Sequence, residues 1–88
     1  MAHIGEFEIN TNGQYVKLLD FIPNFEMVDG TTYTLQIRGN IITQVAPETP
    51  TKGGFIVKDL TPVCYKHKQG NDLYIRTCEE GCIINIAE

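Results

Sequence analysis

Residues 32–38 read Thr-Tyr-Thr-Leu-Gln-Ile-Arg, and their strict alternation decides the fold. Tyr33, Leu35 and Ile37 fall on one face of an extended chain, and polar residues occupy the other face. Successive side chains of a strand point to opposite faces, so this pattern predicts a β-strand with one face on a core. The β-branched and aromatic residues in it favour the same assignment.

The same two-residue period recurs on both sides of this segment. Leu73 and Ile75 alternate with Tyr74 and Arg76, and residues 82–86 alternate as well. Weaker strand candidates are Ile4–Asn10, Gln14–Phe21, Ile41–Val45, Phe55–Lys58 and Val63–His67. Glycine-containing turns separate them, and only residues 15–25 leave room for one helical turn. The sequence predicts one all-β domain over residues 1–88, a small antiparallel β-sandwich or jelly-roll-like barrel of about seven or eight strands.

Length and charge exclude several classes of protein. A chain of 88 residues forms one domain, too small for a Rossmann or barrel enzyme. The net charge of −4 argues against binding to nucleic acid, which requires a basic surface. No apolar run approaches the roughly 18 residues of a membrane span. The first residues lack the basic and apolar regions of a signal peptide, so we expect synthesis and folding in a cytosol and no membrane partner.

Two segments are candidates for contact with a partner. Residues 1–13 carry Ile4, Phe7 and Ile9, and form either an edge strand of the domain or an arm that adds to a partner's sheet. Residues 46–54 form the longest predicted loop and contain Pro47, Thr49 and Pro50. Loops of this length often contact partners.

The three cysteines and His67 are the candidates for a metal or catalytic site. Cys64 and His67 lie an odd number of residues apart, so a straight strand points them to opposite faces. Cys78 and Cys82 flank a turn, where a disulfide is an alternative outside reducing compartments. The sequence contains no serine to act as a nucleophile. We therefore expect plain thiols, no metal or other cofactor, and no enzyme activity.

Lys66, Lys68 and Arg76 form the only basic cluster. If their strands are adjacent, Lys66 and Arg76 share a face, which either keeps the protein soluble or contacts an acidic partner.

A series of short motifs runs from residue 29 to the end of the sequence. The series starts at Asp-Gly-Thr-Thr-Tyr-Thr-Leu-Gln-Ile-Arg-Gly (29–39) and continues through Gln-Val (44–45), Thr-Pro (49–50) and Gly-Phe-Ile-Val (54–57). It ends with Asp-Leu-Tyr-Ile-Arg-Thr (72–77) and Ile-Asn-Ile-Ala-Glu (84–88). The order of these motifs resembles that of small β-rich bacteriophage virion accessory proteins. The sequence departs from that pattern at Ile37, where a polar residue is usual, and at residues 59–62, where Asp-Leu-Thr-Pro replaces a Pro-Gly.

This resemblance implies a structural role on a phage particle, without catalysis. Capsid decoration, anchoring of a head fibre and a tail accessory are the roles it suggests. Capsid or tail proteins are then the partners, and the chain is expected to form a dimer or trimer located in the virion. The alternative is a carbohydrate- or receptor-binding module, in which exposed Tyr15, Tyr65 or Tyr74 stacks on sugar rings.

Overall fold

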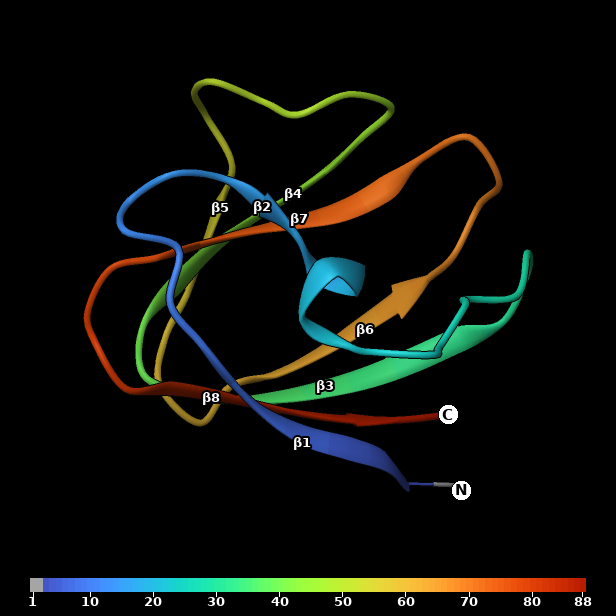
Figure 1. The fold of residues 1–88 in the computed structure, drawn as a ribbon, viewed down its shortest axis with the longest axis horizontal. Coiled ribbons are helices and arrows are strands. Elements are labelled where there is room, and N and C mark those ends of the chain that lie inside the picture. The colour runs from blue at the N-terminus through green and yellow to red at the C-terminus, as the bar shows by residue number, and fades with distance from the viewer. Residues whose placement is uncertain (1–2) are drawn as a thin grey trace.

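The computed structural model describes residues 3–88 as two stacked four-stranded antiparallel sheets measuring 29 × 25 × 22 Å (Figure 1). The strands are β1 (His3–Ile9), β2 (Val16–Lys17), β3 (Thr32–Arg38), β4 (Ile41–Ala46), β5 (Phe55–Val57), β6 (Pro62–Lys66), β7 (Asp72–Thr77) and β8 (Cys82–Ala87). One 3₁₀-helix, η1 (Leu18–Phe21), follows β2. Over residues 3–88, no helix has the length and apolar character needed to cross a membrane.

The strand order is that of a jelly roll. Sheet I has the order β1-β8-β3-β6, and sheet II has the order β2-β7-β4-β5. The first strand pairs with the eighth, the second with the seventh, the third with the sixth, and the fourth with the fifth. This nested pairing folds an eight-strand chain into a double sheet. The predicted all-β sandwich is therefore confirmed.

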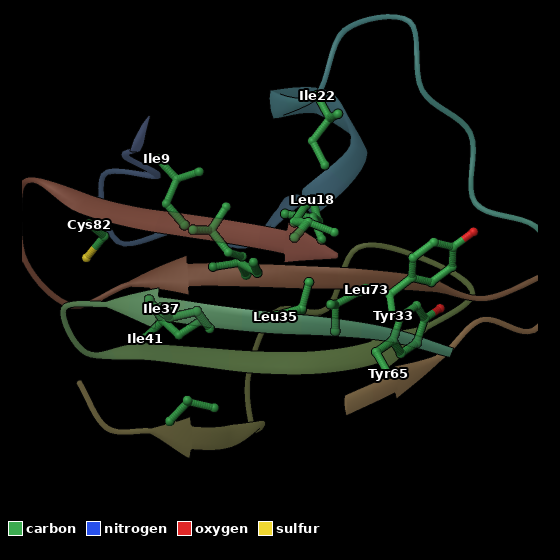
Figure 2. Close-up of a cluster of buried hydrophobic side chains, with 14 residues drawn as sticks. Ile9, Leu18, Ile22, Tyr33, Leu35, Ile37, Ile41, Tyr65, Leu73 and Cys82 are labelled. Atoms are coloured by element: carbon green, nitrogen blue, oxygen red, sulfur yellow. The ribbon is translucent and has the colours of Figure 1, made fainter. Parts of the chain in front are cut away.

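The core lies between the sheets and is filled by the alternate residues of their strands. Tyr33, Leu35 and Ile37 of β3 are at most 1% exposed, as the alternation predicts (Figure 2). On β8, Cys82, Ile84 and Ile86 are fully buried. Burying one large apolar side chain contributes about 1.5–3 kcal/mol, so these two central strands of sheet I carry much of the stability.

Residues 14–31 differ from the prediction. The candidate strand Gln14–Phe21 shrinks to the two residues of β2 followed by η1. The ten residues between Phe21 and Thr32 form a longer loop than the eight between Ala46 and Phe55. Ile22, Phe25 and Met27 of this loop pack on the core. Spaced apolar residues of this kind are typical of a strand or helix, although the backbone here is irregular.

The N-terminal segment is the edge strand of sheet I, paired with β8 over His3–Ile9. Ile9, the last residue of β1, is fully buried in this chain's own core. The prediction that Ile9 contacts a partner is therefore wrong. Ile4 and Phe7 are partly buried against the same core.

Two buried threonines join the sheets. The Thr11 backbone N–H donates to Thr77 Oγ1 at 3.1 Å, and the Thr77 N–H donates to Thr11 Oγ1 at 2.8 Å. The two hydroxyl oxygens lie 3.1 Å apart, so one donates to the other. Thr11 follows β1 of sheet I and Thr77 ends β7 of sheet II, so the three bonds tie the sheets together.

Candidate functional site

A pocket of about 300 Å³ lies where the turn before β2 meets the loop between β4 and β5. It is lined by Gly13, Gln14, Tyr15, Thr49, Pro50, Thr51 and Arg76. Three of the predicted contact residues, Thr49, Pro50 and Arg76, therefore come together here. Pro47 is exposed in the same loop. The pocket is the strongest candidate site because it gathers residues from three distant parts of the chain.

Strand geometry places Arg76 on the outer face of sheet II. Ile75 is fully buried toward the core, so the next side chain must point outward. Val16 pairs with Ile75, and Tyr15 continues that register opposite Arg76. The Arg76 Cζ atom lies 5.4 Å from the centroid of the Tyr15 ring, a cation–π distance.

The glycines of the loop let it close on Tyr15. The Tyr15 hydroxyl donates a hydrogen bond to the Gly53 carbonyl oxygen. Gly54 has φ +115°, and a Cβ there would lie 2.7 Å from Ile42 Cγ2 and 2.9 Å from the Thr43 carbonyl oxygen. Only glycine tolerates both the backbone conformation and this approach. The hydrogen bond from Tyr15 to Gly53 and the close approach of Gly54 to β4 therefore hold the loop side of the pocket in place.

Sequence reasoning missed Tyr15, Gln14 and Thr51 as pocket residues. A two-residue strand has no readable period, so nothing local to residues 14–17 indicates which strand it joins. Only the register between β2 and β7 brings Tyr15 to Arg76.

Lys66 does not share a face with Arg76, contrary to the prediction. β6 belongs to sheet I and β7 to sheet II, because the chain crosses between sheets after Lys66. Lys66 instead lines a separate hollow of about 320 Å³ with Asp29, Gly30, His67 and Lys68.

The tyrosines proposed for sugar stacking are buried. Tyr15, Tyr65 and Tyr74 are 8%, 6% and 4% exposed. Tyr15 lies under the loop, and Tyr65 points inward with its hydroxyl 2.9 Å from His67 Nδ1. Tyr74 is on a central strand, flanked in register by Lys17 and Gln44. The expectation of exposed rings is wrong, because neighbouring strands and loops cover them.

The three cysteines are free thiols. Cys64 and Cys78 are exposed, and Cys82 is buried beneath the turn that precedes β8. Burial, with a smaller contribution from Glu79, raises the pKa of the Cys82 thiol above its ordinary value of 9.0. Within the part of the chain that the structure describes, no three His, Cys, Asp or Glu side chains gather as a metal site.

An exposed apolar edge lies on sheet II, at β5. Phe55 is 78% exposed and Ile56 67% exposed on this edge strand, and Val45 on the adjoining β4 is 50% exposed. Thr43 pairs with Phe55, so Val45 is the diagonal neighbour of Phe55 on the same face. The signal in the sequence is the unbroken apolar run Phe55–Val57, since a half-buried strand would alternate.

Comparison of the chain with protein-family models, curated proteins and solved structures finds no match.

Proposed function

We propose that the chain is a non-enzymatic structural protein of a bacteriophage particle, which docks on the capsid as a decoration protein or head-fibre anchor, or on the tail. The observation that carries the proposal is the jelly-roll strand order, an architecture that recurs in viral capsid domains. This is an analogy at the level of the fold. The order of motifs over residues 29–88 supports the same role independently of the topology.

The apolar edge at β5 is the surface best suited to docking, with Val45 and Phe55 on one face of sheet II and Ile56 on the opposite face. An edge strand presents unpaired backbone groups, and natural proteins usually protect such edges with charged residues. β5 itself carries no charged side chain, whereas the edge strand β1 carries Glu6 and Glu8. A shell or tail protein that adds an apolar strand or surface here would cover both the side chains and the backbone.

Repetition on a symmetric particle makes a modest interface sufficient. A specific contact buries about 800 Å² on each partner. Copies linked as a dimer or trimer bind neighbouring sites with a raised effective concentration, so avidity exceeds the affinity of one contact.

The test is co-sedimentation of the purified chain with particles assembled without it. We expect saturable binding to the particles, and about a tenfold or greater loss of affinity for Phe55→Asp and Ile56→Asp, since burying an unpaired charge is strongly unfavourable. Val28→Asp is the matched control, because Val28 is 62% exposed but lies in the loop before β3. Absence of binding by the unmodified chain, or equal binding by all three variants, contradicts the proposal.

A further inference from the structure

Arg76 lines the pocket, and no carboxylate among residues 3–88 forms an ion pair with its guanidinium. Over residues 3–88, the one ion pair joins Lys17 Nζ and Asp72 Oδ2 at 3.5 Å and does not involve Arg76. Arg76 Nε is buried and has no hydrogen-bond partner in the described chain. Arginine stays protonated at any physiological pH, so this charge is permanent. A charge that is partly withdrawn from water favours binding of an external anion.

The same face holds a second unpartnered polar atom. Gln44 Oε1 is buried without a hydrogen-bond partner among residues 3–88. Ile42 pairs with Arg76 and Gln44 pairs with Tyr74, so Gln44 and Arg76 are diagonal neighbours on the outer face of sheet II. Gly53 lies over Gln44, because a Cβ at Gly53 would be 3.9 Å from its Oε1. The polar groups beneath the loop are therefore incompletely paired by the chain's own residues.

We propose that the pocket between the turn at Gly13–Tyr15 and the loop at Thr49–Thr51 is a carboxylate-binding site anchored by Arg76. The planar guanidinium forms two parallel hydrogen bonds with a carboxylate. Gln14, Thr49 and Thr51 add neutral polar side chains at the wall, and none of residues 3–88 that line the pocket is acidic. One cation suits a monoanion, since phosphate sites rely on several positive groups or a cluster of backbone N–H groups.

The pocket is prearranged for this ligand. The Arg76 guanidinium packs on one face of the Tyr15 ring, and the Tyr15 hydroxyl donates a hydrogen bond to the Gly53 carbonyl oxygen of the loop. Prearrangement reduces the loss of side-chain freedom on binding. The carboxylate belongs either to an acidic side chain of a partner protein or to a free small molecule. The site does not depend on the phage role proposed above.

Nuclear magnetic resonance titration of the ¹⁵N-labelled chain tests the proposal. At constant ionic strength the probes are acetate, a capped Gly-Glu-Gly peptide, its Gly-Gln-Gly analogue and inorganic phosphate. We expect acetate and the Glu peptide to shift the backbone signals of Gly13, Tyr15 and Thr51 saturably, and the Gln peptide to leave them unmoved. Tighter binding of the Glu peptide than of acetate assigns the site to a protein side chain, and equal binding assigns it to a free carboxylate.

Four variants complete the experiment. Arg76→Gln is expected to weaken acetate binding by about tenfold or more, whereas the exposed Arg38→Gln on sheet I leaves it unchanged. Thr51→Glu places a carboxylate at the rim and abolishes acetate binding, whereas Thr61→Glu, at an exposed threonine that does not line the pocket, retains it. Thr51 and Thr61 are both exposed, so both variants keep the fold. The proposal is overturned if no probe shifts the signals, if phosphate binds more tightly than acetate, or if Arg76→Gln binds as the unmodified chain does.

Discussion

The threonine pair that joins the sheets gives the sharpest test of the packing. Thr77→Val keeps the volume of the side chain but removes the acceptor of the Thr11 N–H and the hydroxyl–hydroxyl bond. Thr11→Val does the same to the Thr77 N–H. Each variant leaves one buried backbone N–H unpaired, which costs about 1–3 kcal/mol. Since 1 kcal/mol corresponds to about 4–8 °C in a domain of this size, a 2 kcal/mol loss lowers Tm by about 8–16 °C.

The double variant refines this magnitude. Both single variants remove the same hydroxyl–hydroxyl bond, so the sum of their effects counts it twice. The double variant Thr11→Val with Thr77→Val should therefore lose less free energy of unfolding than the two single variants together. The expected difference is the contribution of one hydrogen bond, about 0.5–1.5 kcal/mol. Urea unfolding followed by circular dichroism measures all three, with the exposed Thr32→Val as control. Single variants within about 0.5 kcal/mol of the unmodified protein, the usual range for a surface substitution, would refute the reasoning.

Other predictions follow from the loop and from the thiols. Gly54→Ala should lower Tm more than Gly13→Ala in thermal scans, because both have positive φ but only the Gly54 Cβ meets other atoms; equal losses would contradict the proposed close approach. In the folded protein, iodoacetamide should alkylate exposed Cys64 rapidly and buried Cys82 slowly, with mass spectrometry locating the adducts. The pKa of Cys82 is raised on folding, so the native state keeps this proton when the unfolded state loses it; the free energy of unfolding should fall as pH rises above about 9, and fall less steeply in Cys82→Ala.

Periodicity predicted the elements that place one face on the core. β3 alternates apolar and polar residues along its length, and its apolar residues are the buried ones. In β8 the buried residues alternate with partly buried ones, and Cys82, Ile84 and Ile86 share the face that the two-residue period predicts. β7 was predicted only in part, because Tyr74 is buried on its outer face as well. The neighbouring strands on both sides of a central strand bury part of its outer face, and the sequence of that strand alone does not indicate this burial.

Periodicity could predict neither the order of the strands nor the position of the pocket. His3 pairs with Ala87, and Val16 pairs with Ile75, so the partners are far apart in the chain. Loop position indicates Thr49 and Pro50, and charge indicates Arg76, but their proximity depends on how the β4–β5 loop closes over sheet II. Tyr15 was assigned to the wrong environment for the same reason.

The place of β8 within sheet I has a consequence for biosynthesis. β8 lies between β1 and β3, although it follows β3 by more than forty residues along the chain. Until the ribosome has released Cys82–Ala87, β1 has no neighbour to pair with and β3 lacks its partner along one edge. The nascent chain therefore cannot acquire its native sheet by stepwise growth, and completion must be a late, concerted event.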